Sequence, residues 1–163
     1  MKKIILILLL AINFNTYSQG LPTKPSNGFS FPLGSKVTIK LYPTDSINFN
    51  FSIIKYEPFE ETIDSWGEDI LFEENEEKET IEFYFCLGTN GETADEKEKN
   101  MKVLLLMNNR TEYSLIYDSD IQTEEKGEFK KTSNVGIYPN IKATEMWPYM
   151  IHQIGLKNFK LRK

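Results

Sequence analysis

Apolar and polar residues alternate with a period of two in several stretches of this chain, which is the pattern of a half-buried β-strand. Residues 36–42 alternate in this way, and residues 47–53 do so again after the short polar turn 43–46. Two such runs joined by a short turn predict an antiparallel hairpin. The alternation changes phase at Ile53 and Ile54, and a β-bulge at this point explains the change.

Further strands are expected on both sides of this hairpin. Residues 80–87 are rich in aromatic and β-branched residues, and the unbroken apolar run 102–107 predicts a strand that is buried on both faces. Residues 112–121 predict another strand, and residues 129–138 predict one or two short ones. The segment 21–34 contains three prolines and two glycines, so we expect an extended lead-in with a short edge pairing.

The spacing of apolar residues changes near the C-terminus. Thr144 suits a helix N-cap, Gly155 suits the position that ends a helix, and four residues between them share one helical face: Trp147, Met150, Ile151 and Ile154. We therefore predict a short C-terminal helix, followed by a strand or packed tail at 156–161. At 59–70 the apolar spacing fits either a short helix or an irregular loop.

Together these elements predict a mainly β fold with six to eight strands and one late helix. An antiparallel β-sandwich with a short C-terminal helix is the first choice, and a partly open barrel is the alternative. A parallel sheet would need helices between the strands, and the pattern does not supply them. Because the chain shows no internal repeat and no linker, residues 19–163 are predicted to form a single domain.

The first 18 residues have the layout of a secretory signal peptide. A basic start at Lys2 and Lys3 precedes nine apolar residues at 4–12, and a polar stretch then leads to an expected cleavage after Ser18. A membrane-spanning helix needs about 20 apolar residues. The only cysteine, Cys86, lies too far along the chain to carry an N-terminal lipid. We therefore predict a soluble, secreted or periplasmic protein with no membrane anchor in its mature form.

Charge is unevenly distributed along the mature chain. Cleavage leaves 17 basic and 24 acidic side chains, a net charge of −7. The segment 57–98 alone has 16 acidic residues and two lysines, and its last part, continuing to Asn100, is interpreted as a charged excursion. An acidic protein with scattered positive charge is a poor nucleic-acid binder, so we expect no such partner. The acidic segment either keeps the protein soluble or binds a cationic partner, and the first role is the commoner one.

The sequence contains no recognisable set of catalytic residues. His152 is the single histidine, so a nucleophilic triad would have to use it, and in the predicted helix it is a partly exposed structural residue. Cys86 lies in a strand-like run and is expected to be a buried thiol. One cysteine and one histidine do not make a typical zinc site. We accordingly assign no catalytic, cofactor-binding or metal-binding residue, and no cofactor.

Three further patterns carry little information. Asp118-Ser-Asp120 begins like a calcium-binding loop, but the later positions of that loop lack the required residues. Trp66 and Trp147 have side chains that stack well on sugars, although tryptophans at such spacing are more often core anchors. Asn50 and Asn109 each begin an N-glycosylation motif, which has meaning only if the source is eukaryotic.

From these observations we predict an exported, non-catalytic module that binds a protein, a glycan or a small ligand. The alternatives are a small carboxylate-dependent hydrolase of envelope polysaccharide and a small-ligand-binding β-barrel. The hydrolase requires two carboxyl groups roughly 5–10 Å apart in an aromatic-lined cleft. The barrel requires a large apolar cavity in place of a filled core. The sequence leaves the identity of the partner and the oligomeric state open.

Overall fold

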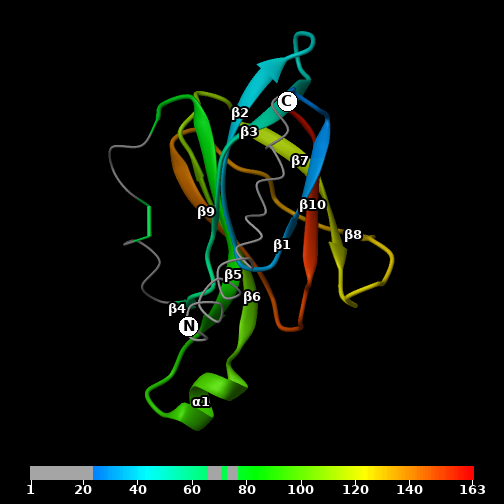
Figure 1. Cartoon of the computed structure of the whole chain (residues 1–163). Coiled ribbons are helices and arrows are strands. Elements are labelled where there is room, and N and C mark those ends of the chain that lie inside the picture. The colour runs from blue at the N-terminus through cyan, green and yellow to red at the C-terminus, as the bar shows by residue number, and fades with distance from the viewer. Residues whose placement is uncertain (1–23, 66–70, 73–76) are drawn as a thin grey trace, which may run out of the picture.

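The computed structural model describes residues 24–65, 71–72 and 77–163, and these residues form ten β-strands and one short helix (Figure 1). The elements are, in chain order, β1 (Gly28–Pro32), β2 (Ser35–Pro43), β3 (Phe49–Pro58), β4 (Thr62–Asp64), β5 (Thr80–Thr89), α1 (Ala94–Lys99), β6 (Lys102–Asn109), β7 (Leu115–Gln122), β8 (Lys130–Thr132), β9 (Ile141–Trp147) and β10 (Gln153–Leu161).

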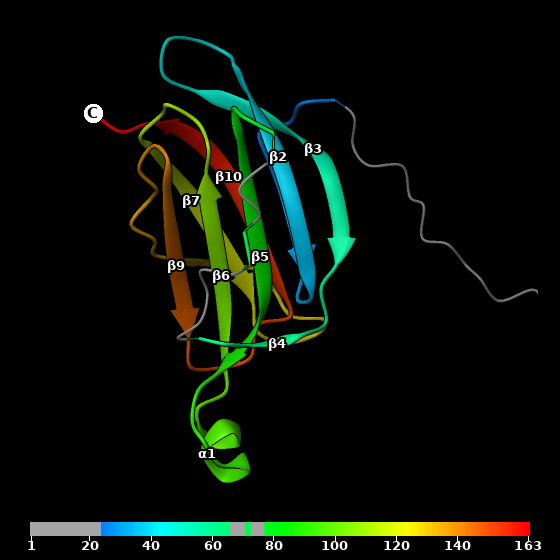
Figure 2. The ribbon, with the colours of Figure 1, turned by 90° about the vertical axis from the view of Figure 1, so that its left-hand side faces the viewer.

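The strands form two sheets. The four-stranded sheet has the order β1-β10-β7-β8, and the six-stranded sheet has the order β3-β2-β5-β6-β9 with β4 beside β5. Figure 2 shows the five long strands of the six-stranded sheet side by side in this order. All pairs are antiparallel except that of β4 with β5. The prediction of a mainly β, antiparallel fold is therefore confirmed.

The first predicted hairpin is confirmed, and so is its bulge. β2 pairs with β3 antiparallel, with Thr38 opposite Lys55 and Ile39 opposite Ile53. Ile54 is thus the extra residue of the second strand, at the point where the apolar alternation changes phase. Before the bulge, Phe49, Phe51 and Ile53 lie in the core, whereas Ile54 at the bulge is 37% exposed.

The main core lies between the two sheets and is filled by aromatic side chains. Phe51 of β3 meets Phe159 of β10 edge-on with ring centroids 5.2 Å apart, and Tyr117 of β7 stacks on Phe159 at 5.0 Å. Phe51, Tyr117 and Phe159 belong to one cluster of buried residues from both sheets. The two sheets therefore share one apolar core, and apolar burial is the main favourable contribution to folding.

The opposite face of the six-stranded sheet is covered by the segment between β3 and β5. A second apolar cluster joins residues of β5 and β6 to residues of this segment: Phe59, Ile63, Leu71, Phe72, Tyr84, Cys86, Leu104 and Leu106. Residues 103–107 of β6 are consequently buried on both faces, as the apolar run predicted. Cys86 is completely buried, which confirms its interpretation as a packing residue.

The predicted C-terminal helix is wrong, because its residues belong to β9, a turn and β10. Trp147, Ile151 and Ile154 are all buried, so the apolar pattern identified core positions but not the element that carries them. β9 pairs with β6, and β10 pairs with both β1 and β7. These hydrogen bonds come from partners far along the chain, and local periodicity cannot report them.

The helix of the described residues, α1, lies instead in the charged excursion. Thr93 caps it by accepting a hydrogen bond from the Glu96 backbone N–H, and the Glu96 side chain accepts one from the Thr93 N–H. This is a capping box, and it nucleates six residues of which none is buried. In the segment 59–70, residues Thr62–Asp64 form β4, so the helix alternative is wrong where that segment is described.

The predicted signal peptide, residues 1–18, and Trp66 lie outside the described residues. Within the described part of the chain, no helix has the length and apolar character that crossing a membrane requires.

Candidate functional site

The outer face of the four-stranded sheet carries a concentration of polar side chains. In β7, residues 115, 117, 119 and 121 are buried, so Asp118 and Asp120 project to the other side. Cross-strand pairing places Gly155 of β10 between Ser30 of β1 and Asp120 of β7. Lys131 of β8 pairs with Asp120 from the other neighbouring strand. Two residues along β7, Asp118 is paired with Lys157 of β10. The sheet therefore arranges acids, amines and a hydroxyl in two short rows.

An irregularity in β10 directs Asn158 onto this face. The register of β10 against β7 shifts between Lys157 and Lys160, and Asn158 adopts a positive φ of 57°. Asparagine tolerates this left-handed conformation better than most residues. Bulges that re-aim a side chain occur often beside binding and active sites.

Asn158 connects two distant parts of the chain through its amide. Its Nδ2 donates to Asp118 Oδ2 at 2.8 Å, and its Oδ1 accepts from Asn27 Nδ2 at 2.7 Å. The Asn158 backbone N–H also donates to the Asn27 carbonyl, with an N–O distance of 3.1 Å. We refer to Asn27, Asn158 and Asp118 as the asparagine bridge. Because these bonds fix the side chains in advance, a ligand would meet an ordered surface.

Asp118 is held as a carboxylate. Hydrogen bonds from Asn158 and from Lys131, whose Nζ lies 2.9 Å from Asp118 Oδ1, lower the pKa of Asp118 below its ordinary value. The positive charges of Lys131 and Lys157 act in the same direction. Asp120 pairs with Lys157. Each acid of this face thus has an adjacent amine, and the local charge is close to balanced.

On one side of the asparagine bridge is a polar cleft of about 530 Å³. It is lined by Asn27, Thr44, Asp45, Asn48, Phe49, Asn50, Asp118, Asn158, Phe159 and Lys160. The turn 44–48 makes a fixed wall, since Asp45 Oδ1 accepts from the backbone N–H groups of Ile47 and Asn48, both at 2.8 Å. Within the described part of the chain, neither the Asn50 amide nor the Lys160 amine has a side-chain partner. Both groups can therefore bind a ligand.

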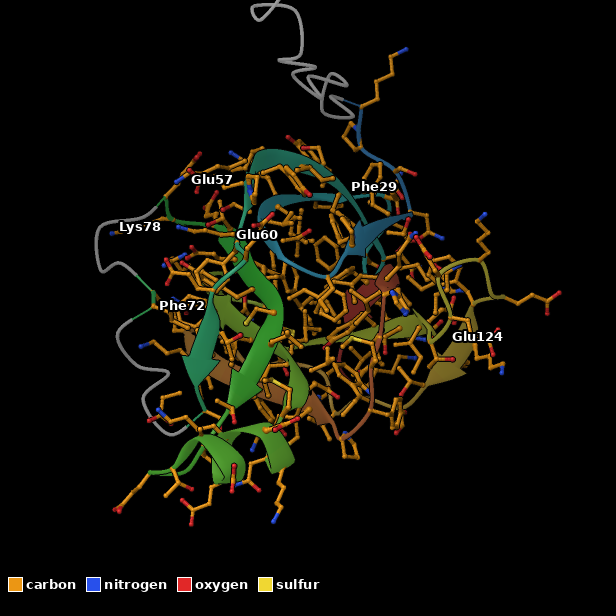
Figure 3. The ribbon with its side chains drawn as sticks, turned by 60° about the horizontal axis from the view of Figure 1, so that its bottom comes forward. Phe29, Glu57, Glu60, Phe72, Lys78 and Glu124 are labelled. Carbon is orange, nitrogen blue, oxygen red and sulfur yellow. The ribbon has the colours of Figure 1, made fainter. Side chains whose placement is uncertain are left out.

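On the other side of the bridge is a shallower groove of about 390 Å³, which shares Asn27 with the polar cleft. Its floor is Gly155, beside Phe129, which is 43% exposed. A Cβ added to Gly155 would meet nothing closer than 3.8 Å, so packing does not require glycine there. Because glycine has no side chain, the backbone of the sheet is accessible at Gly155, next to the aromatic ring of Phe129. Figure 3 shows Phe29, another residue of this groove, on the opposite side of the molecule from Phe72.

A buried ionic cluster on the six-stranded sheet is the other concentration of charge. Glu82 of β5 is completely buried, with Oε2 at 2.9 Å from Arg110 Nη1 and Oε1 at 3.4 Å from Lys36 Nζ. Burial tends to lower the pKa of Lys36, but the hydrogen bond with Tyr84 and the charges of Glu82 and Glu57 raise it above its ordinary value. This cluster joins β2, β5 and the end of β6. It also shows that the acidic segment 57–98 is partly structural.

The remaining candidate residues of the sequence have structural roles. His152 is half-buried in the turn before β10, where its backbone N–H donates to the Gln122 carbonyl. Trp147 is a core residue whose Nε1 lies 3.3 Å from Thr132 Oγ1, as expected for an anchor. Asn109 is fully buried and donates to the carbonyls of Tyr113 and Tyr138, so the folded protein does not present it for glycosylation. Asn50 lines the polar cleft.

Two site residues carried no individual signal in the sequence. Asn27 and Asn158 are 131 positions apart, and only the pairing of β1 with β10 brings them together. Asp118 and Asp120 begin like a calcium-binding loop, but their spacing of two is also the spacing of residues on a shared strand face. Among the described residues, no group of three or more His, Cys, Asp or Glu side chains is placed to hold a metal ion.

Comparisons with protein-family models, with curated proteins and with solved structures found no match for this chain. The chemistry of the outer face is therefore the basis on which a function can be proposed.

Proposed function

We propose that this protein is an exported, non-catalytic module that binds a neutral glycan on the outer face of its four-stranded sheet. The observation that carries the proposal is the asparagine bridge between two adjoining depressions. A carboxamide offers a donor and an acceptor side by side, and a hydroxyl group of a sugar offers the same pair. The polar cleft contains four such amides, from Asn27, Asn48, Asn50 and Asn158.

The groove beside the bridge supplies the complementary apolar contact. A pyranose ring has polar edges and a face of C–H groups, and an exposed aromatic ring such as Phe129 packs against that face. Gly155 leaves room for the sugar on the sheet surface. The balanced charges of Asp118 and Asp120 with Lys131 and Lys157 favour an uncharged ligand over an anionic one.

For the fold we propose a filled antiparallel β-sandwich of one domain. The aromatic core between the sheets supports it. An isolated antiparallel β-bridge between the backbones of Asn48 and Lys160 also joins the sheets at one corner. The rings of Phe51, Tyr117 and Phe159 occupy the interior that a ligand-carrying barrel would leave open. The sandwich therefore accounts for the packing better than the barrel.

A hydrolase is the weaker alternative. Asp118 and Asp120 lie two residues apart on one strand face, which separates their Cα atoms by roughly 7 Å. Glycoside hydrolysis needs one carboxyl group that is protonated at neutral pH. The pKa of Asp118 is instead lowered, and Asp120 is paired with an amine. These environments suit two hydrogen-bond acceptors.

The proposal is tested with the mature chain, residues 19–163, by affinity electrophoresis in gels that contain soluble polysaccharides. We expect at least one neutral glucan, mannan or xylan to retard the protein, while anionic polysaccharides do not and no reducing ends are released. Retardation by no glycan, or release of reducing ends, contradicts it. Export is tested separately, since N-terminal sequencing of the secreted form should begin at Gln19.

A further inference from the structure

A third depression, of about 390 Å³, lies where α1 meets the start of β6 and the end of β9. Its lining residues are Asn90, Lys99, Asn100, Met101, Lys102, Met146, Trp147 and Pro148. α1 is at the bottom of Figure 1, whereas the C-terminal end of β10 and the β2–β3 turn are at the top. This depression, here called the methionine pocket, therefore lies at the other end of the molecule from the polar cleft, and it shares no lining residue with the cleft or the groove.

One part of the methionine pocket is lined by apolar residues: Met101, Met146, Trp147 and Pro148. Met101 and Met146 are 40% and 56% exposed, and neither belongs to the two buried apolar clusters. Trp147 directs its only polar atom, Nε1, toward Thr132 and so presents hydrocarbon to the pocket. Methionine side chains adapt their shape to an apolar guest, and they are common on surfaces that bind varied ligands.

The rim of the pocket is positively charged within an acidic part of the chain. Lys99 and Lys102 line it, and none of the lining residues carries a carboxylate. Lys102 Nζ donates to Asn90 Oδ1 at 3.2 Å, and Asn100 Nδ2 donates to the Asn90 carbonyl at 2.8 Å, so neutral groups position this rim. In the described part of the chain, neither lysine forms an ion pair with an acid.

We infer that the methionine pocket binds an amphipathic carboxylate, a small molecule with an apolar body and a single negative charge. The apolar body lies on Met101, Met146 and Trp147, and the carboxylate meets Lys99 and Lys102. An apolar floor with a few convergent polar groups is the usual composition of a small-molecule site, and this volume lies in the usual range. The inference is independent of the glycan proposal, because no residue is shared between the two sites.

The probes are decanoate, below its micelle concentration, and decanol, which has the same chain without the charge. Isothermal titration calorimetry of the mature protein should show saturable binding of decanoate, tighter than that of decanol. The double substitution Lys99→Gln/Lys102→Gln should weaken decanoate binding about three- to tenfold, the range expected for two exposed ion pairs, and leave decanol unchanged. Met146→Ser should weaken the binding of both decanoate and decanol.

Lys24→Gln/Lys126→Gln, which removes two exposed lysines outside the methionine pocket, is the charge-matched control and should bind both probes as the wild type does. Equal affinity for decanoate and decanol, or unchanged decanoate binding in the double variant, overturns the inference, and so does the absence of saturable decanoate binding. Since none of the substituted positions is buried, the variants should fold, and circular dichroism checks that they do.

Discussion

Asn158 Nδ2 donates a hydrogen bond to Asp118 Oδ2 at 2.8 Å, and this contact joins the irregular part of β10 to the centre of the polar sheet face. It requires the positive φ of Asn158, because an extended residue at this position would have its side chain on a different side of the strand. The contact also holds Asp118 as an acceptor and fixes Asn158 in the lining of the polar cleft. The proposed binding surface depends on this pair.

The first prediction concerns pH. The folded-state pKa of Asp118 is lowered, so its contribution to stability is present above the unfolded pKa of about 4 and is lost as the pH falls through the folded value. Asp118→Asn should therefore reduce the unfolding free energy near pH 7 by roughly 0.5 kcal/mol, since the group is a third exposed and solvent screens it. The difference between variant and wild type should shrink as the pH falls below about 4 and through the lowered pKa of Asp118. Urea unfolding at a series of pH values measures it, and a constant difference would contradict this account.

The second prediction concerns the buried ionic cluster. Glu82→Ala leaves Lys36 without a buried partner and should lower the unfolding free energy by roughly 3–5 kcal/mol. The exposed Glu112→Ala is the control and should change it by less than about 0.5 kcal/mol. Both are measured by urea unfolding at pH 7. Equal effects of the two substitutions would show that the cluster has no structural role.

The third prediction separates stability from binding at Gly155. Gly155→Ala adds a methyl group where the nearest atom is 3.8 Å away, so it should raise the unfolding free energy by about 0.4–1 kcal/mol. The same methyl group occupies the floor of the groove and should weaken glycan binding. In contrast, Gly88→Ala would place its Cβ 2.2 Å from Leu104 Cδ1 and should destabilise the protein. A Gly155→Ala variant that loses stability or keeps full binding speaks against the groove.

Much of the strand pattern is predictable from the sequence, because each long strand has one face in the core between the sheets. Period-two alternation therefore marks β2 and β3, and burial on both faces gives β6 its unbroken apolar run. The predicted C-terminal helix is wrong because buried residues from separate elements can imitate a helical spacing. Trp147, Ile151 and Ile154 come from two strands and a turn, yet their spacing happens to match a helical face.

The site was much less predictable than the fold. The sequence pattern of a polar surface residue is the same whether the residue contacts a ligand or only solvent. Asn27 and Asn158 therefore resemble any other asparagines in the sequence. They come together only through the register of β1 against β10 and the register shift within β10. Similarly, the role of Glu82 depends on Lys36 and Arg110, which approach it from neighbouring strands.

The fourth prediction concerns the single thiol. Cys86 is completely buried beneath the segment that contains Phe72, so a thiol reagent should reach it only when that cluster opens. Labelling with Ellman's reagent should be negligible in buffer and should reach one equivalent in strong denaturant. Rapid stoichiometric labelling of the native protein would show that the second apolar cluster does not protect Cys86.

The central claim is that the asparagine bridge binds a glycan, and Asn158→Gly tests it most directly. Glycine retains the positive φ of Asn158 and removes only the amide. Asn140→Gly is the matched control, because Asn140 also has a positive φ, of 55°, and lines neither depression of the face. The measurement is the dissociation constant of both variants for the glycan that retards the wild type. We predict binding at least about tenfold weaker in Asn158→Gly, because loss of the amide releases the Asn27 and Asp118 side chains that it fixes in the cleft, and unchanged binding in Asn140→Gly. Equal affinity of the two variants would contradict the account.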